Sequence, residues 1–189
     1  MRESRLLPIL RSQTQGELLA RLFLNPGREF MISDLARSLA VSVPGIHHEA
    51  VRLIEAGYIT ERREGRNRLV KANTEMVISE SLTTLLALTY GPIPMIEDAL
   101  KSVKGIEKIF IYGSWAKRYT GVAGGVPRDI DLGIVGSVKT DDIYEQLTQI
   151  EETLMREVNF TIFSESDWKS GSPLINEIKR NPMININLE

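Results

Sequence analysis

The chain has 189 residues, of which 42% are hydrophobic and 25% are charged, and its formal net charge is −2. This length suits two small domains, and the composition is that of an ordinary globular protein rather than a disordered or membrane-embedded one. The absence of cysteine excludes disulfides and thiolate metal sites, and no apolar run reaches the ~18 residues of a membrane-spanning helix.

The first predicted elements are two short helices. Residues 14–24 carry leucines at helical spacing, and Asn25-Pro26-Gly27 predicts the end of that helix. A short extended stretch at 30–32 follows. Ser33 is then the expected N-cap of a helix over 34–39, in which Asp34 favours the positive end of the helix dipole.

A third helix and a hairpin complete this part of the chain. A tight turn at Ala40-Val41 precedes Ser42 and Pro44, which predict the start of a helix running to Gly57. Its predicted buried stripe consists of Ile46, Ala50, Leu53 and Ile54. Residues 58–63 and 68–72 are the expected strands of a hairpin with Glu64-Gly65-Arg66-Asn67 at its tip.

Charge is distributed unevenly along the chain. Residues 1–72 contain twelve Lys and Arg against eight Asp and Glu, a net of +4, whereas the remainder contains eleven against seventeen, a net of −6. A basic module is therefore hidden within a slightly acidic chain, and basic surfaces of this kind are suited to phosphate contacts.

The order helix, helix, tight turn, helix, basic hairpin resembles the winged helix-turn-helix DNA-binding domains of the ArsR/MarR type, and Leu53-Ile54-Glu55-Ala56-Gly57-Tyr58-Ile59 is similar to the end of their recognition helix. The resemblance implies a DNA-binding domain at 1–75 that contacts double-stranded DNA. The recognition helix would present Ser42, Pro44, Gly45, His47, His48 and Arg52 to the major groove. The hairpin would contribute Arg62, Arg63, Arg66, Arg68 and Lys71. The alternatives are a solvated charged surface or a winged module that binds protein or RNA.

Residues 76–92 form a predicted connection between two domains. A helix over 76–90 has Leu82, Leu85, Leu86 and Thr89 as its better apolar stripe, and Gly91-Pro92-Ile93-Pro94 predicts a sharp end. Relatives of winged-helix regulators often dimerise through a helix at this place. Packing against the C-terminal domain is the alternative use of the stripe. A homodimer is expected because two wings commonly read a two-fold site.

Strands alternate with helices over the remaining range, 93–189. The pattern predicts a helix over 94–104 and strands at 106–112, 130–135 and 157–163. Helices are expected over 114–119, 141–155 (capped by Thr140), 164–169 and 173–180, with an extended piece at 183–188. This alternation predicts a small sheet with helices packed on it. The expected fold class is therefore α/β (α+β), with a helical, hairpin-containing domain followed by a sheet domain.

Two short motifs within this second domain indicate a place for a metal and a phosphate. The first motif is Gly113-Ser114, which ends a predicted strand. The second is Asp129-Ile130-Asp131, which begins fifteen residues after Ser114. Side chains alternate along a strand, so Asp129 and Asp131 share a face and repel each other unless a cation such as Mg²⁺ lies between them. Gly113 permits close backbone approach to a phosphate, and Ser114 opens a helix whose N-terminus favours anions.

The two motifs together resemble the signature of the DNA polymerase beta superfamily of nucleotidyltransferases. The resemblance covers residues 93–165. It implies that Gly113 and Ser114 bind the phosphates of an NTP, that Asp129 and Asp131 are the catalytic, metal-binding acids, and that Mg²⁺ is the cofactor. Lys117 or Arg118 would neutralise charge as pyrophosphate leaves.

The family carries a third acid on the following strand, and this chain departs from that pattern. The equivalent position is Asn159, whose amide oxygen can ligate a metal but supplies no negative charge. Glu157 lies on the same face by the two-residue period and is the candidate substitute. The departure favours nucleotide or metal binding over catalysis.

Three functions follow from these patterns. The first is a DNA-binding transcriptional regulator whose nucleotidyltransferase-like domain serves as a nucleotide sensor, an interaction platform or a vestigial domain. The second is an active Mg²⁺-dependent enzyme that transfers NMP to a protein, RNA or small-molecule hydroxyl, a role that includes toxin–antitoxin systems. The third is a winged module used for protein assembly. Residues 6–10 are too short for the core of a signal peptide, so a cytoplasmic location without membrane contact is expected.

Overall fold

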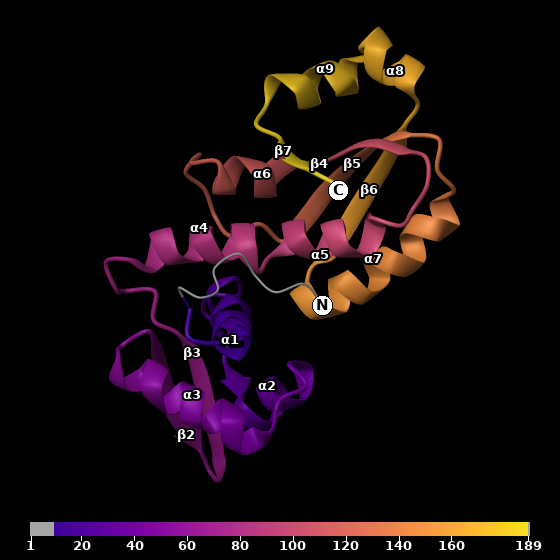
Figure 1. The fold of residues 1–189 in the computed structure, drawn as a ribbon. Helices are drawn as coiled ribbons and strands as arrows, with labels where there is room; N and C mark the ends of the chain where they lie inside the picture. The colour runs from indigo at the N-terminus through magenta and orange to yellow at the C-terminus, as the bar shows by residue number, and fades with distance from the viewer. Residues whose placement is uncertain (1–9, 189) are drawn as a thin grey trace. The chain divides into compact units, whose positions relative to one another are not determined.

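The computed structural model describes residues 10–188 and has a mixed α/β architecture with two small sheets. The chain divides into two compact units, Met1–Gly91 and Pro92–Glu189. Each unit contains one of the sheets (Figure 1). The segment 76–92, which the sequence sets apart as a connection, falls almost wholly within the first unit.

The first unit consists of four helices and a three-stranded antiparallel sheet among the residues described. Its elements are α1 Gln13–Phe23, β1 Phe30–Met31, α2 Ile32–Ser38, α3 Val43–Glu55, β2 Ile59–Glu64, β3 Asn67–Ala72 and α4 Ser79–Thr89. The strand order is β1-β3-β2. The predicted hairpin is confirmed, and its register pairs Ile59 with Ala72 and Glu64 with Asn67.

Local capping explains where two of these helices begin. The Ser12 hydroxyl accepts from the backbone N–H of Gln15, and the Ser42 hydroxyl accepts from that of Gly45. Pro44 occupies the first turn of α3, where its missing N–H costs nothing. The predicted cap at Ser33 is wrong: α2 begins at Ile32, directly after β1, and has no side-chain cap.

Helix α4 belongs to the core of the first unit because it packs on α1. Leu86 and Ala87 are fully buried, whereas Leu85, another member of the predicted apolar stripe, is 43% exposed. At the end of α4, the Tyr90 ring lies so close to Gly16 of α1 that a Cβ added to Gly16 would stand 2.1 Å from a ring carbon. The absence of a side chain at Gly16 is therefore what lets Tyr90 approach.

The second unit is a four-stranded mixed sheet with helices on both faces. Its elements are α5 Pro92–Leu100, β4 Ile106–Tyr112, α6 Gly113–Tyr119, β5 Asp129–Gly136, α7 Thr140–Leu154, β6 Glu157–Phe163, α8 Glu165–Ser170, α9 Pro173–Arg180 and β7 Ile184–Ile186. The strand order is β6-β5-β4-β7, in which β5 and β6 are parallel and the other pairs antiparallel. The predicted cap at Thr140 is wrong, because Thr140 is already helical and Lys139 precedes it without a side-chain bond.

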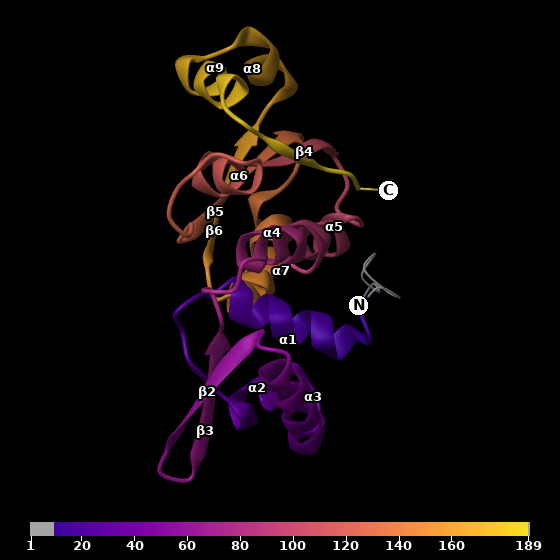
Figure 2. The same ribbon diagram turned by 90° about the vertical axis from the view of Figure 1, so that its left-hand side faces the viewer.

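The two faces of this sheet are covered differently. Helices α5 and α7 lie along one face (Figures 1 and 2). Helices α8 and α9 lie on the other face, where Ile175 and Ile178 of α9 join Phe110, Val135 and Phe163 in one hydrophobic cluster. Val135 and Phe163 stand at the ends of β5 and β6 opposite to Asp129 and Glu157, so α8 and α9 cover one end of this face.

Among the helices that the structure describes, none is both long enough and apolar enough to cross a membrane.

Candidate functional site

The connection from β4 to α6 brings the backbone of Gly113 against the side chain of Asp131. Gly113 has φ +71°, and a Cβ built on it would stand 2.1 Å from Asp131 Oδ2 and 3.0 Å from Cγ. Tyr112 is paired with Asp131 in the sheet, so Gly113 follows at the point where the chain leaves β4. Only glycine combines this left-handed conformation with this approach. The two motifs predicted from the sequence therefore meet at one place.

Asp129 and Asp131 are both half-buried at the beginning of β5, on the face that carries Gly133 and Val135. Burial, reinforced by the negative charge of Asp129, raises the pKa of Asp131 above its ordinary value. Each effect penalises the ionised form of Asp131. A cation bound between the two carboxylates would remove both penalties, because it replaces lost hydration and opposes the repulsion.

The neighbouring strand β6 supplies an amide beside this pair. In the parallel register Asn159 is directly opposite Asp131, and Glu157 is directly opposite Asp129. Both β6 side chains are exposed. No group of three or more His, Cys, Asp or Glu side chains within the described part of the chain is arranged to hold a metal. Two carboxylates and an amide oxygen are the donor set, and such hard oxygens suit Mg²⁺.

The remaining residues expected around a phosphate lie along α6. Ser114 is exposed in the first turn of the helix, while Lys117 and Arg118 are half-buried in its last turn. A helix rises about 1.5 Å per residue, so the two cations stand roughly 6 Å further along the axis than Gly113. Close to the acids, the Nε of Arg156 donates to the carbonyl of Pro127 at 3.0 Å and ties down the end of the loop that joins α6 to β5. Sequence reasoning missed this role of Arg156.

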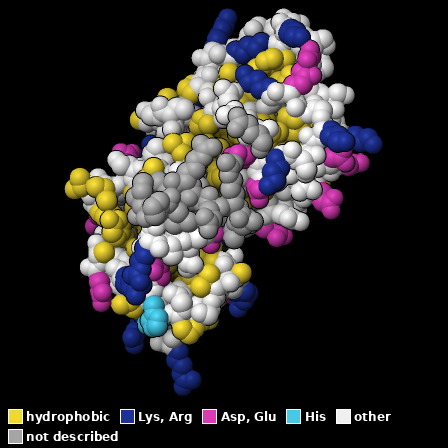
Figure 3. Space-filling view, viewed as in Figure 1, with side chains coloured by type: hydrophobic (Ala, Val, Ile, Leu, Met, Phe, Trp, Pro, Cys, Tyr) yellow, Lys and Arg dark blue, Asp and Glu magenta, His cyan; other side chains and the backbone are white. Residues whose placement is uncertain are grey.

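In the first unit, the residues predicted to contact DNA are gathered on α3 and the hairpin. Ser42, Pro44, His47, His48 and Arg52 are exposed on α3, and Gly45 is half-buried. The Ser42 hydroxyl is occupied as the helix cap, and Arg52 lies 3.6 Å from Glu49 of the same helix. Figure 3 shows Lys and Arg side chains and a histidine together at the end of this unit formed by α3 and the hairpin.

The hairpin divides its basic side chains between two faces. Arg63 and Arg68 are cross-strand partners on the face that also carries the buried Ile59 and Val70. Arg62 alternates to the opposite face. Arg66 is at the tip, and Lys71 is exposed on β3.

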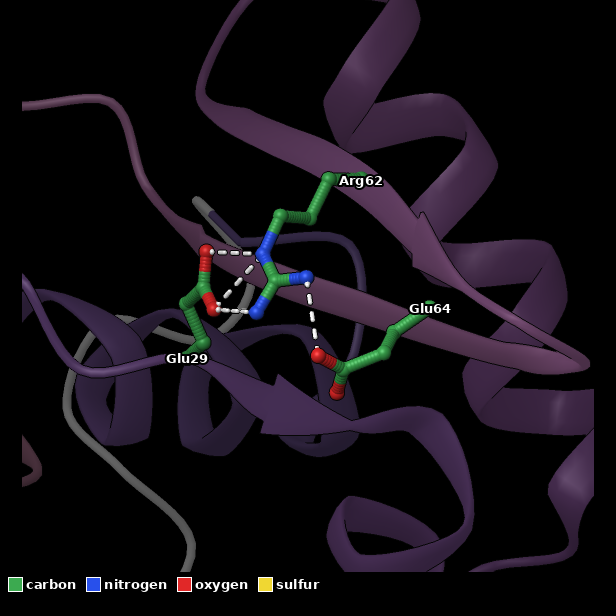
Figure 4. Close-up of polar contacts among 3 residues, drawn as sticks. All are labelled: Glu29, Arg62 and Glu64. Carbon is green, nitrogen blue, oxygen red and sulfur yellow. Dashed lines mark hydrogen bonds and ion pairs between the residues drawn. The ribbon is translucent and has the colours of Figure 1, made fainter.

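Arg62 is held by carboxylates on both sides (Figure 4). Its Nε and Nη2 reach Glu29 at 2.8 and 2.7 Å, and its Nη1 lies 3.5 Å from Glu64. This contact lowers the pKa of Glu29 and keeps it ionised. Arg62 thus fastens the hairpin to the segment before β1. No local sequence pattern predicts this pair, because Glu29 approaches Arg62 only through the pairing of β1 with β3.

Arg68 is engaged on the other face. Its Nε donates to Glu61, and its Nη1 lies 2.6 Å from Nε2 of His47 on α3. The Glu61–Arg68 contact is a diagonal cross-strand pair, which the predicted hairpin register could have revealed. The His47 contact joins the helix and the hairpin into one polar surface.

The sequence was compared with protein-family models and with curated proteins, and neither comparison found a match.

Proposed function

We propose that this chain is a DNA-binding transcriptional regulator of the winged helix-turn-helix type whose second unit is a nucleotidyltransferase-like domain that binds Mg²⁺ and a nucleotide without transferring it. The observation that carries the DNA-binding part is the contact between His47 of α3 and Arg68 of the hairpin. It makes the exposed side chains of a helix and of a basic hairpin one continuous surface, and helices and two-stranded ribbons are the elements that the major groove of a duplex admits.

Charge supports duplex DNA as the partner. Residues 1–72 carry a net charge of +4 within a chain of net charge −2. Arg63, Arg66 and Lys71 are exposed, and no ion pair of theirs is present among the described residues. They are therefore the cations best able to neutralise phosphates. The proposal includes a homodimer and a cytoplasmic location, and sedimentation at micromolar concentration tests the former.

The second unit supports ligand binding more strongly than catalysis. Asp129, Asp131 and Asn159 would hold the cation, and the backbone at Gly113 with Ser114 would approach the phosphates. When bound, Mg²⁺ would supply charge neutralisation between the nucleotide and the two acids. Two-metal transfer uses more bridging carboxylate than this pair offers, which is why binding is the proposed role.

Active transfer is the second candidate, favoured by the position of Glu157 directly beside Asp129. In that reaction the oxygen of an acceptor hydroxyl attacks the α-phosphorus of the NTP and forms an O–P bond. The bond from the α-phosphorus to the oxygen that bridges to the β-phosphate breaks, pyrophosphate leaves, and the hydroxyl proton passes to solvent. Incubation with labelled NTPs, Mg²⁺ or Mn²⁺ and candidate acceptors tests it. Label transferred by the wild type and lost in both Asp129→Ala and Glu157→Gln would establish the enzyme and overturn the binding role.

The DNA-binding part is tested by fluorescence anisotropy with duplex DNA, single-stranded DNA and duplex RNA of one sequence. Duplex DNA is expected to bind most tightly, and Arg66→Ala is expected to weaken binding. Lys139→Ala, which removes an exposed cation of the second unit, is the matched control and is expected to leave binding unchanged. Equal binding of all three nucleic acids, or none, would point instead to an RNA-binding or protein-assembly module.

A further inference from the structure

Three polar side chains are in contact where the hairpin meets α3. Glu61 of β2 accepts from Nε of Arg68 on β3, and Nη1 of Arg68 lies 2.6 Å from Nε2 of His47 on α3. The side chains of Arg68 and Glu61 are 22% and 32% exposed, less than the 49% of Arg62 on the opposite face. Arg68 is therefore the more buried of the two arginines.

The donors and acceptors of these three side chains determine where their protons lie. A guanidinium has only donors, so Nε2 of His47 must accept, and the ring proton lies on Nδ1. Arg68, reinforced by the charge of Arg63, lowers the pKa of Glu61, which is therefore ionised. The two contacts use two of the five N–H donors of Arg68 and leave three for a ligand.

A carboxylate is an unexpected group on a surface that binds phosphates. Glu61 repels a polyanion and lowers non-specific affinity, so a surface serving only electrostatic attraction gains nothing from it. What Glu61 does provide is orientation. A guanidinium held at Nε by a carboxylate loses less rotational freedom when its free N–H groups bind a flat acceptor pair.

Resting on the proposed DNA-binding function, we propose that Glu61, Arg68 and His47 form one readout unit, in which Glu61 and His47 are positioning residues that aim Arg68 at a guanine. Guanine presents two adjacent acceptors, O6 and N7, in the major groove, and arginine is their commonest partner. These three side chains are attached to α3 through His47, so the guanine lies next to the bases that α3 contacts.

The matched comparison is Glu61→Gln against Glu29→Gln. Each substitution removes one carboxylate that is paired with a hairpin arginine, but Glu29 holds Arg62 on the opposite face. The preferred duplex is first selected from a randomised pool with the wild type. Anisotropy then measures the ratio of affinities for that duplex and for duplexes with each guanine replaced, and thermal unfolding by circular dichroism checks that each variant is folded.

The proposal expects Glu61→Gln to lower the discrimination ratio at one guanine by about tenfold or more, the range for a good bidentate contact, while it raises non-specific affinity. Glu29→Gln is expected to leave the ratio unchanged. Arg68→Lys keeps the charge but not the planar fork, so it is expected to lower the ratio at the same guanine. If Glu61→Gln tightens binding to all duplexes equally with the ratio unchanged, Glu61 is only a repulsive charge and the proposal is overturned.

A second readout needs no DNA. Long-range ¹H–¹⁵N NMR spectra distinguish the two tautomers of His47, and with only two histidines in the chain, His48→Gln assigns the signals. The Nδ1–H tautomer of His47 is expected in the wild type. The Nε2–H tautomer would overturn the contact between Arg68 and His47, and with it the proposal. Failure of the wild type to bind any duplex would instead overturn the proposed function, so the two failures are distinguishable.

Discussion

The close approach of Gly113 to Asp131 makes a quantitative prediction about Gly113→Ala. A left-handed conformation costs a residue with a Cβ about 1–2 kcal/mol. The new Cβ would also stand 2.1 Å from Asp131 Oδ2, more than 1 Å inside an ordinary contact. Displacing that carboxylate or the backbone adds about 1–3 kcal/mol. The substitution is therefore expected to lower the free energy of unfolding of the second unit by about 2–5 kcal/mol.

Gly171→Ala is the matched control within the same unit. Gly171 has φ +76°, nearly that of Gly113, but the nearest atoms to its Cβ would all belong to the side-chain amide of Asn176, with Oδ1 at 3.0 Å. It is expected to cost about 1–2 kcal/mol, the conformational part alone. In an Asp131→Ala background the clash is absent, so Gly113→Ala should cost no more than Gly171→Ala.

Urea unfolding followed by tryptophan fluorescence measures these changes. Both tryptophans of the chain, Trp115 and Trp168, are in the second unit, so the signal reports on that unit even if the two units unfold separately. The reasoning predicts a coupling energy of at least about 1 kcal/mol between Gly113 and Asp131 in the double-mutant cycle. Strictly additive effects of Gly113→Ala and Asp131→Ala would refute the proposed contact.

Three further substitutions test other parts of the structure. Replacing glycine by alanine inside a helix usually raises the free energy of unfolding by about 1 kcal/mol. For Gly16→Ala we expect the opposite, a loss of about 1–3 kcal/mol, because the new Cβ collides with the Tyr90 ring. In a Tyr90→Ala background the usual gain should return, as measured by urea unfolding followed by far-UV circular dichroism. Ala40 is exposed and has φ +52°, so Ala40→Gly removes the strain of a left-handed conformation. The free energy of unfolding from the same transition should rise by about 0.5–1 kcal/mol, and an unchanged or lower value would argue against this turn. Asp131→Asn should raise the melting temperature at neutral pH, because burial and Asp129 raise the pKa of Asp131 in the folded state and the ionised group costs stability above that pKa. This advantage over the wild type should shrink as the pH falls through the raised pKa, and a constant difference at every pH would contradict the ionisation argument.

The elements were largely predictable because each carries a local signal. The strand before Gly113 and the strand after Asp129 are apolar runs, and their period correctly placed Asp129 and Asp131 on one face. The same period put Asn159 and Glu157 on one face of β6, and the register sets them beside the two acids. Helix starts were less predictable, because α2 follows β1 without a side-chain cap and Ser33 is consequently inside the helix.

The partners of the basic residues could not be derived in the same way. Arg62 and Arg68 are both simply charged positions on a strand in the sequence, yet one is tied to Glu29 and the other to Glu61 and His47. Glu29 and His47 lie 33 and 21 residues away from these arginines in the chain. Only the pairing of β1 with β3 and the packing of α3 on the hairpin bring them together, and no local pattern encodes either.

Contact of α3 and the hairpin with the phosphates and bases of duplex DNA is tested by the salt dependence of binding. The slope of log K against log salt concentration is negative, and its magnitude falls by about 0.9 for each phosphate contact that is removed. We expect a steep slope for the wild type, a slope smaller in magnitude by about one for Arg66→Ala, and an unchanged slope for Arg62→Ala, since Arg62 is already paired with Glu29. A wild-type slope near zero, or equal losses for the two variants, would contradict it.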